Sequence, residues 1–293
     1  MGVTTVMPDR TLKQDRDDAS SDSVAEFPQA WEKSDLYLPL ETEVSAVPEE
    51  SRVVVHNDPR SPAADRFRWA GMRLKSIQAA RGLKTLLITS PLPGDGKSTV
   101  ALNLATVLTE KGKHPVLLVE ADTYRPSLVN KLGLRPLPGM HECYTRKSEP
   151  MQVIRRIDPL GFYLLPAGQV EGDDNVLFQS NFVPQLIRDL ASTSFSWILI
   201  DSPPTTPIAE ILALKAHADA TLLVARAGHT PREAIEETTR NLGRDHIIGI
   251  ILNAVEGLDR IYSKYYGYVN PEAPVKAKTS KGAKGLGLNK LGT

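Results

Sequence analysis

The chain has 293 residues, of which 41% are hydrophobic and 24% are charged, and its formal net charge is zero. These values suit one large α/β domain or two small ones, and the balanced charge gives no indication of nucleic-acid binding. No stretch reaches the roughly 20 apolar residues of a membrane helix, no secretory signal is recognisable, and a single cysteine excludes an internal disulfide. We therefore expect a cytoplasmic protein.

The two ends of the chain differ in composition from its centre. Residues 1–64 hold 13 acidic and six basic residues, whereas residues 271–293 hold five lysines and one acid. Both ends are poor in large apolar residues and rich in Pro, Gly or Ser, which is typical of disorder. We expect a disordered acidic N-terminal segment over 1–64, a folded domain over 65–260, and a tyrosine cluster with a flexible basic tail over 261–293.

The centre of the chain alternates short apolar runs with longer helical patterns. The predicted strands are Lys84–Ser90, Pro115–Glu120, Gly161–Pro166, Trp197–Asp201, Ala220–Ala225 and His246–Asn253, and the predicted helices are Asp65–Arg81, Lys97–Lys111, Gln179–Ala191, Pro207–His217 and Pro231–Leu242. The strand runs are nearly continuously apolar, which suits burial on both faces. Thr230 to Glu233 form a capping box at the start of the last helix. This alternation predicts an α/β fold with a doubly wound, mostly parallel sheet.

A glycine-rich loop stands between the first predicted strand and its helix. It reads Ser-Pro-Leu-Pro-Gly-Asp-Gly-Lys-Ser-Thr over residues 90–99, although Pro91 replaces the usual first glycine. Such a loop can point backbone N–H groups at phosphate oxygens, while Lys97 reaches the β and γ phosphates and Ser98 ligates Mg²⁺. The alternative is a strand-to-helix turn with no ligand. We predict a P-loop whose cofactor-binding residues are Gly94, Asp95, Gly96, Lys97, Ser98 and Thr99.

Acidic residues end two further predicted strands. Asp201 follows the apolar run 197–200 and is placed to hold Mg²⁺, usually through a water molecule. Glu120 and Asp122 end the strand after the P-loop helix, and residues i and i+2 of an extended segment share a side. Both carboxylates should therefore converge on the metal–phosphate region, where one would help to hold metal and the other would accept a hydroxyl proton. The alternative is a solvated strand end.

These three motifs, in this order, resemble the bacterial tyrosine kinase (BY-kinase) family, the autokinases of capsule and exopolysaccharide synthesis. Min- and Par-type ATPases are more distant relatives of the same fold. The resemblance covers roughly residues 65–270 and is strengthened by a tyrosine cluster of the kind that these kinases autophosphorylate, although such a cluster can also pack or bind a partner. The expected phosphorylation sites are Tyr262, Tyr265, Tyr266 and Tyr268.

The resemblance implies a protein-tyrosine autokinase that uses ATP and Mg²⁺. The implied catalytic residues are Lys97, Glu120, Asp122 and Asp201, and the implied metal ligands are Ser98, Asp122 and Asp201. Asn253 either approaches the adenine or has a structural role. The implied partners are a membrane adaptor of the polysaccharide chain-length-determinant type, further copies of the chain and a phosphotyrosine phosphatase, with recruitment to the inner face of the membrane. The alternatives are a Min/Par-like ATPase switch and a nucleotide-binding scaffold.

The chain departs from the BY-kinase pattern at two places. The family's second acidic motif normally begins with Asp, and an Arg stands where this chain has Tyr124; here the first acid is Glu120. Since a shift of about an ångström can cost on the order of 10²-fold in rate, Glu120→Asp is expected to raise autophosphorylation. The family's oligomerisation helix has Glu and two Arg, whereas this chain offers Asp65, Arg68 and Gly71. Assembly through this helix is expected to be weaker.

Overall fold

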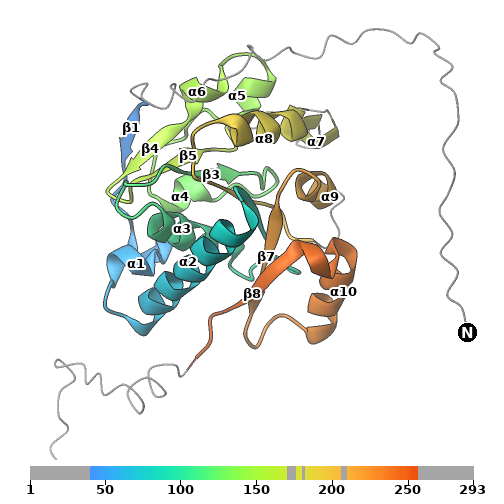
Figure 1. The fold of residues 1–293 in the computed structure, drawn as a ribbon. Helices are drawn as coiled ribbons and strands as arrows, with labels where there is room; N and C mark the ends of the chain where they lie inside the picture. Colours follow the sequence, from blue (N-terminus) through green and yellow to red (C-terminus); the bar gives the residue numbers. More distant parts are fainter. Residues whose placement is uncertain (1–39, 170–175, 180–181, 206–209, 257–293) are drawn as a thin grey trace, which may run out of the picture.

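A computed structural model describes residues 40–169, 176–179, 182–205 and 210–256 (Figure 1). In these ranges one sheet of eight strands has the order β1-β4-β5-β3-β6-β2-β7-β8. The strands are β1 (Thr42–Val44), β2 (Thr85–Thr89), β3 (Val116–Glu120), β4 (Arg155–Asp158), β5 (Phe162–Leu165), β6 (Trp197–Asp201), β7 (Ala220–Arg226) and β8 (Ile247–Asn253). Only the β4–β5 pair among them is antiparallel. The predicted doubly wound, mostly parallel sheet is confirmed.

Helices cover both faces of this sheet (Figure 1). They are α1 (Val54–Asn57), α2 (Pro62–Arg81), α3 (Lys97–Leu108), α4 (Leu128–Lys131), α5 (Met140–Tyr144), α6 (Pro150–Val153), α7 (Val176–Gln179), α8 (Phe182–Ser192), α9 (Glu210–Lys215) and α10 (Arg232–Leu242), with short 3₁₀ turns η2 (Glu49–Ser51) and η3 (Arg244–His246). The cores of α2 and α3 belong to one hydrophobic cluster, and those of α8 and α9 belong to a second cluster on the opposite face. No helix in the described ranges is both long enough and apolar enough to cross a bilayer.

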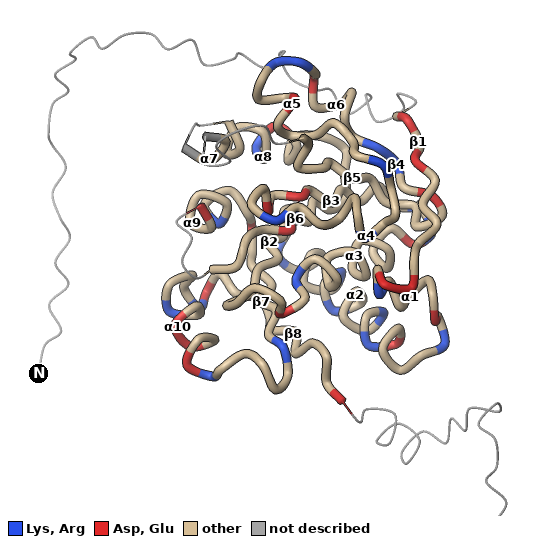
Figure 2. Tube along the Cα trace, turned by 180° about the vertical axis from the view of Figure 1, so that it is seen from behind, with Lys and Arg blue, Asp and Glu red and all other residues tan. Residues whose placement is uncertain are grey.

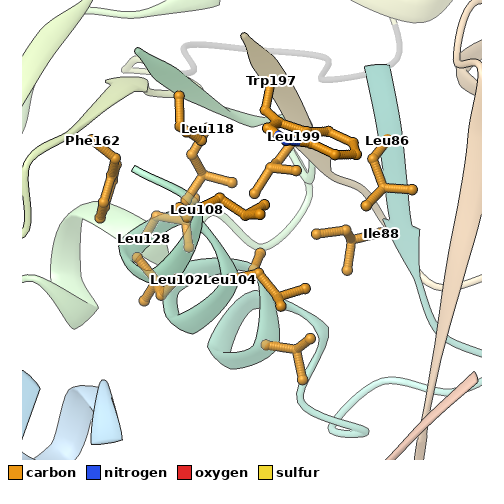
Figure 3. Packing of buried hydrophobic residues seen from close by; sticks show 14 of the residues in the cluster. Leu86, Ile88, Leu102, Leu104, Leu108, Leu118, Leu128, Phe162, Trp197 and Leu199 are labelled. Atoms are coloured by element: carbon orange, nitrogen blue, oxygen red, sulfur yellow. The ribbon is translucent and has the colours of Figure 1, made fainter. Parts of the chain in front are cut away.

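The alternation of side chains along the central strands decides where the polar strand ends point. Trp197 and Leu199 of β6 pack in the same cluster as Leu104 of α3 (Figure 3), while the alternate residues of β6, Ile198 and Ile200, belong to the other cluster. Since successive strand residues point to opposite faces, Asp201 emerges on the α3 side. The same parity in β3 places Glu120 on that side. The buried core thus brings both carboxylates to the helix that follows the P-loop.

The N-terminal boundary of the folded domain lies earlier than predicted. Residues 40–64, which composition assigned to a disordered segment, contain β1, η2, α1 and the start of α2. Ser45 Oγ donates a hydrogen bond of 2.6 Å to Leu132 O, and Val53 is completely buried. Acidic residues lie along this segment beside β1 and α1 (Figure 2). The charged side chains of residues 40–64 face solvent, while a few apolar and hydroxyl side chains pack against the domain. Residues 1–39 and 257–293, including the tyrosine cluster, lie outside the described residues.

Three other local predictions differ from the structure. The short strands β1 and β4 were not expected, because their sequences hold few apolar residues. β8 is an edge strand in the described sheet, and its Ile250 and Leu252 are exposed rather than buried on both faces. No side chain caps α10, whose N-cap is Pro231. The Thr230 hydroxyl turns instead to the P-loop residue Asp95, so a long-range contact replaces the expected capping box.

Candidate active site

The P-loop joins β2 to α3, as the sequence predicts, and its conformation depends on glycine. Gly94 and Gly96 have φ angles of +85° and +97°, which other residues rarely adopt. Gly96 is the N-cap residue of α3, so the loop ends at the positive end of a twelve-residue helix. A Cβ atom at Gly96 would collide with the side-chain nitrogen of Asn253. The loop therefore has the geometry of an anion-binding turn at a helix N-terminus.

Lys97 stands among the acidic residues that were predicted to surround it. Its Nζ lies 2.7 Å from Asp122 Oδ2, and the other oxygen of Asp122 accepts a hydrogen bond of 3.1 Å from Arg125 N. Burial lowers the pKa of Lys97, but the negative charges of Asp201, Asp122 and Glu120 outweigh burial and leave the pKa raised. The ammonium therefore stays charged at neutral pH.

Asp201 is an almost completely buried acid of the site. Burial raises its pKa to about 7, although the Lys97 charge and a hydrogen bond with Ser98 oppose the rise. Its Oδ1 atom has no hydrogen-bond partner among the described residues. A buried carboxylate oxygen without a donor, beside a hydroxyl, is a suitable pair of oxygen ligands for Mg²⁺. The described residues contain no cluster of three or more His, Cys, Asp or Glu side chains for a metal, so the remaining ligands would be water and phosphate oxygens, which Mg²⁺ commonly keeps.

Glu120 has a different environment from Asp122, although both lie on the same side of the sheet. Its Oε1 accepts hydrogen bonds from Ser127 N at 2.5 Å and Leu128 N at 2.6 Å, and its Oε2 accepts one from Ala167 N at 3.3 Å. Burial raises the pKa of this carboxyl, and the three backbone donors oppose the rise. Glu120 Oε1 thus accepts from the backbone at the start of α4, and Oε2 accepts from the backbone that follows β5. Nothing in the local sequence signals this arrangement.

Three further predicted cofactor residues also make contacts within the protein. Asp95 is completely buried, and its carboxylate contacts the loop between β7 and α10. Asn253 Nδ2 donates a hydrogen bond of 2.9 Å to Asp95 O, which gives Asn253 a structural contact with the P-loop. In α3, Thr99 O accepts a hydrogen bond from Asn103 Nδ2 at 2.9 Å. Sequence reasoning missed the contact between the segment 226–230 and the P-loop.

The residues at the two departures from the kinase pattern are also engaged. Tyr124 Oη donates a hydrogen bond of 2.8 Å to Glu210 Oε1 of α9. In α2, Arg68 Nη1 pairs with Asp65 at 2.7 Å. A Cβ atom at Gly71 would lie 2.5 Å from Val107 of α3. The absence of a side chain at position 71 thus allows α2 to pack closely on α3 within the same domain.

A family model described as ParA, an NUBPL iron-transfer P-loop NTPase, matches residues 83–253. This range is more than half of the chain and contains the P-loop and every acidic residue of the site. The chain belongs to the ParA family of P-loop NTPases.

Several known proteins resemble this ParA-family chain. Tyrosine-protein kinase YwqD of Bacillus subtilis is 27% identical over 217 residues, which cover 73% of this chain and 91% of the relative. The succinoglycan biosynthesis transport protein ExoP of Rhizobium meliloti is 29% identical over 211 residues, which cover 70% of this chain and 26% of ExoP. The kinase domain of the Escherichia coli tyrosine kinase ETK superposes with a TM-score of 0.64 at 25% identity, covering 69% of this chain and 80% of that domain.

The ParA-family chain spans nearly all of the Bacillus kinase but only about a quarter to a third of ExoP and of several other curated relatives. Its relatives of known name are repeatedly tyrosine-protein kinases. These similarities confirm the predicted resemblance to bacterial tyrosine kinases, and they favour that interpretation over a Min/Par-like switch.

Proposed function

We propose that this chain is an MgATP-dependent protein-tyrosine autokinase that regulates the synthesis or export of a capsular polysaccharide or exopolysaccharide. The observation that carries the proposal is the cluster of Lys97, Asp122 and Asp201 beside a correctly formed P-loop. The names of the relatives, which include tyrosine kinases and a polysaccharide transport protein, support the same conclusion.

The proposed roles follow from the contacts of each side chain. Lys97 and the P-loop amides bind the phosphates and stabilise charge that develops during transfer. Ser98 and Asp201 would hold Mg²⁺, with Asp122 near enough to assist, and the ion would supply further charge stabilisation. Because a γ-phosphate would compete with Asp122 for the Lys97 ammonium, phosphate binding would release Asp122 to accept the proton of the incoming tyrosine.

Glu120 takes a positioning role in this proposal. Its three backbone hydrogen bonds fix the ends of the segment between β3 and α4, and that segment carries Asp122. Both oxygens of Glu120 accept from backbone N–H groups that phosphate does not displace, whereas the Asp122 oxygen paired with Lys97 is freed when the ammonium turns to a phosphate. The acid–base work therefore falls to Asp122, and Asn253 contributes by holding the P-loop whether or not it also approaches the adenine.

The proposed acceptors are the tail tyrosines Tyr262, Tyr265, Tyr266 and Tyr268. Since the tail follows directly after β8, a neighbouring copy of the chain offers an accessible active site, and we propose a homo-oligomer. A membrane adaptor of the polysaccharide chain-length-determinant type would recruit the kinase to the inner face of the membrane, and a phosphotyrosine phosphatase would reset it. Each added phosphate carries about −1.5 to −2 charges at neutral pH, so multiple phosphorylation would repel the tail from the acidic site.

Incubation of the full chain with MgATP, followed by anti-phosphotyrosine detection and mass spectrometry, tests this function. Phosphotyrosine should appear in the tail. Lys97→Met should reduce its formation on the order of 10²–10³-fold, because the Lys97 ammonium supplies positive charge at the phosphates, and circular dichroism of the variant checks that the fold is kept. A chain with all four tail tyrosines changed to Phe should still bind ATP but lose most of the label. ATP hydrolysis without any phosphotyrosine would contradict the proposal in favour of an ATPase switch.

A further inference from the structure

We propose that Thr230, assisted by His229 and Asn253, is a positioning residue that holds the P-loop in its nucleotide-binding conformation from the carboxyl ends of β7 and β8. This inference rests on the proposed binding of nucleotide at the P-loop. It gives a role to the contact between the P-loop and residues 226–230, a segment that lies outside the phosphate-binding and acidic motifs.

The first part of the contact is the buried carboxylate of Asp95. Its Oδ1 accepts a hydrogen bond of 2.6 Å from Thr230 Oγ1 and lies 3.1 Å from His229 Nδ1. Its Oδ2 accepts a hydrogen bond of 3.0 Å from Leu92 N within the P-loop itself. Asp95 is completely buried, and a buried carboxylate is unfavourable unless donors surround it. The Asp95 carboxylate therefore has all of these hydrogen bonds only while the P-loop packs against residues 229–230.

The second part acts on the P-loop backbone. Gly94 O accepts a hydrogen bond of 3.3 Å from Arg226 Nη1, and Asp95 O accepts one of 2.9 Å from Asn253 Nδ2. In a planar trans peptide the C=O and the following N–H point in opposite directions. Fixing these two carbonyls toward the ends of β7 and β8 therefore turns the N–H groups of Asp95 and Gly96 away from those strands. These N–H groups are left as donors for a phosphate.

Thr230 is itself held in place, so its hydroxyl is a fixed donor rather than a free rotor. Its Oγ1 accepts a hydrogen bond of 2.7 Å from Arg226 N while it donates to Asp95. Ala227 N donates 2.9 Å to Asn253 O, which joins the same loop to the end of β8. A single hydroxyl thus connects the backbone of one loop to the buried acid of the other. Valine, which has the same shape, removes both hydrogen bonds, whereas serine can keep both.

The expected effect is on nucleotide affinity rather than on the chemical step. A P-loop that is held less firmly spends less time in the binding conformation, and the apparent Kd rises in inverse proportion to that fraction. Bound nucleotide restores the conformation, so the rate at saturating ATP should change little. Loss of a hydrogen bond to a buried charged group corresponds to a change in Kd of about tenfold.

The test uses the full chain and two readouts, titration with the fluorescent analogue mant-ADP in the presence of Mg²⁺ and initial rates of autophosphorylation. Thr230→Val should raise the Kd about tenfold and leave kcat at saturating ATP within about twofold. Thr230→Ser should restore nearly normal affinity. Thr239→Val is the matched control, because this hydroxyl donates only to Ile235 O of its own helix α10, and it should leave the Kd unchanged.

Several outcomes would overturn the inference. These are an unchanged Kd in Thr230→Val, an equal loss in Thr239→Val, failure of Thr230→Ser to recover binding, or a lower kcat at unchanged Kd. His229→Ala removes the contact made by a half-exposed ring, and a rise in Kd of about two- to threefold keeps the test available if Thr230→Val does not fold. Mant-ADP binding is read without phosphoryl transfer. A chain that binds mant-ADP and phosphorylates no tyrosine would therefore refute the proposed kinase and leave this inference standing.

Discussion

Replacing Glu120 with Asp shortens the side chain by one carbon at a point where three backbone N–H groups converge. Glu120 Oε1 accepts from Ser127 N and Leu128 N, and Oε2 accepts from Ala167 N. A carboxylate withdrawn by about 1.5 Å cannot reach both the start of α4 and Ala167. Comparison with the kinase motif alone predicts that this substitution raises activity, since the family has Asp here. The structure predicts the opposite.

The magnitude follows from the hydrogen bonds that are lost. Each hydrogen bond to a charged acceptor contributes about 1.5–3 kcal/mol, and an unsatisfied buried N–H adds a similar cost. With partial relaxation, we expect Glu120→Asp to lower the free energy of unfolding by about 2–4 kcal/mol. Because the freed segment carries Asp122, a displacement near 1 Å should lower the rate of autophosphorylation by at least tenfold.

Urea denaturation and initial rates of autophosphorylation measure the two effects of Glu120→Asp separately. Glu120→Gln is the matched control, since its amide oxygen can still accept from Ser127 and Leu128 while its NH₂ group faces the N–H of Ala167. This variant should lose less stability than the Asp variant. An Asp variant that is as stable as the wild type and more active would refute the positioning role and restore the interpretation based on the family motif.

Two further predictions use the perturbed pKa values. Without metal, Asp201 has a pKa of about 7 in the folded chain against 3.8 for an unperturbed aspartate, so between these pH values the folded state holds a proton that the unfolded state releases. The free energy of unfolding, measured in EDTA, should therefore fall by up to about 4 kcal/mol from pH 4 to pH 7, and an Asp201→Asn variant that keeps this slope would assign it to another group. Burial, followed by the charges of Glu142 and Glu149, raises the pKa of the Cys143 thiol to about 12. Labelling with a disulfide reagent at pH 8 should be roughly a thousandfold slower in the native than in the unfolded chain, and rapid native labelling would show that residues 139–149 open.

The parts of the fold that the sequence predicts best are the strands that are buried on both faces. The runs that became β2, β3, β6 and β7 are apolar on both faces because helices cover both sides of the sheet, and their predicted and observed bounds agree to within one residue at each end. The strands β1 and β4 escape this pattern. Arg155-Arg156-Ile157-Asp158 holds a single apolar side chain, since β4 lies near the margin of the sheet. Its pairing depends on neighbours that no local pattern reveals.

The candidate site divides in a similar way. The P-loop, Asp122 and Asp201 could be predicted because strand ends and a strand-to-helix loop fix their positions from local sequence alone. The surroundings of Glu120 could not, because its donors come from Ser127, Leu128 and Ala167 on two other segments. Thr230 shows why local signals can mislead. A threonine before Pro is typical of a helix cap, yet the buried Asp95, 135 positions away, offers it a charged acceptor.

The position of β1 has a consequence for how the chain folds as it is made. β1 is synthesised early, but it joins the sheet only through β4, where Thr42 lies opposite Arg156. The antiparallel β4–β5 pair is joined by a short connection and can form locally. Because β1 precedes β4 in the chain, it is available to pair with β4 as soon as β4 forms, whereas β4 without β1 would present an open edge to an extended segment of another chain. The acidic segment 40–64 thus supplies the strand that covers β4, and the edge of the described sheet becomes a three-residue strand that carries Glu43, which is a poor template for edge-to-edge pairing.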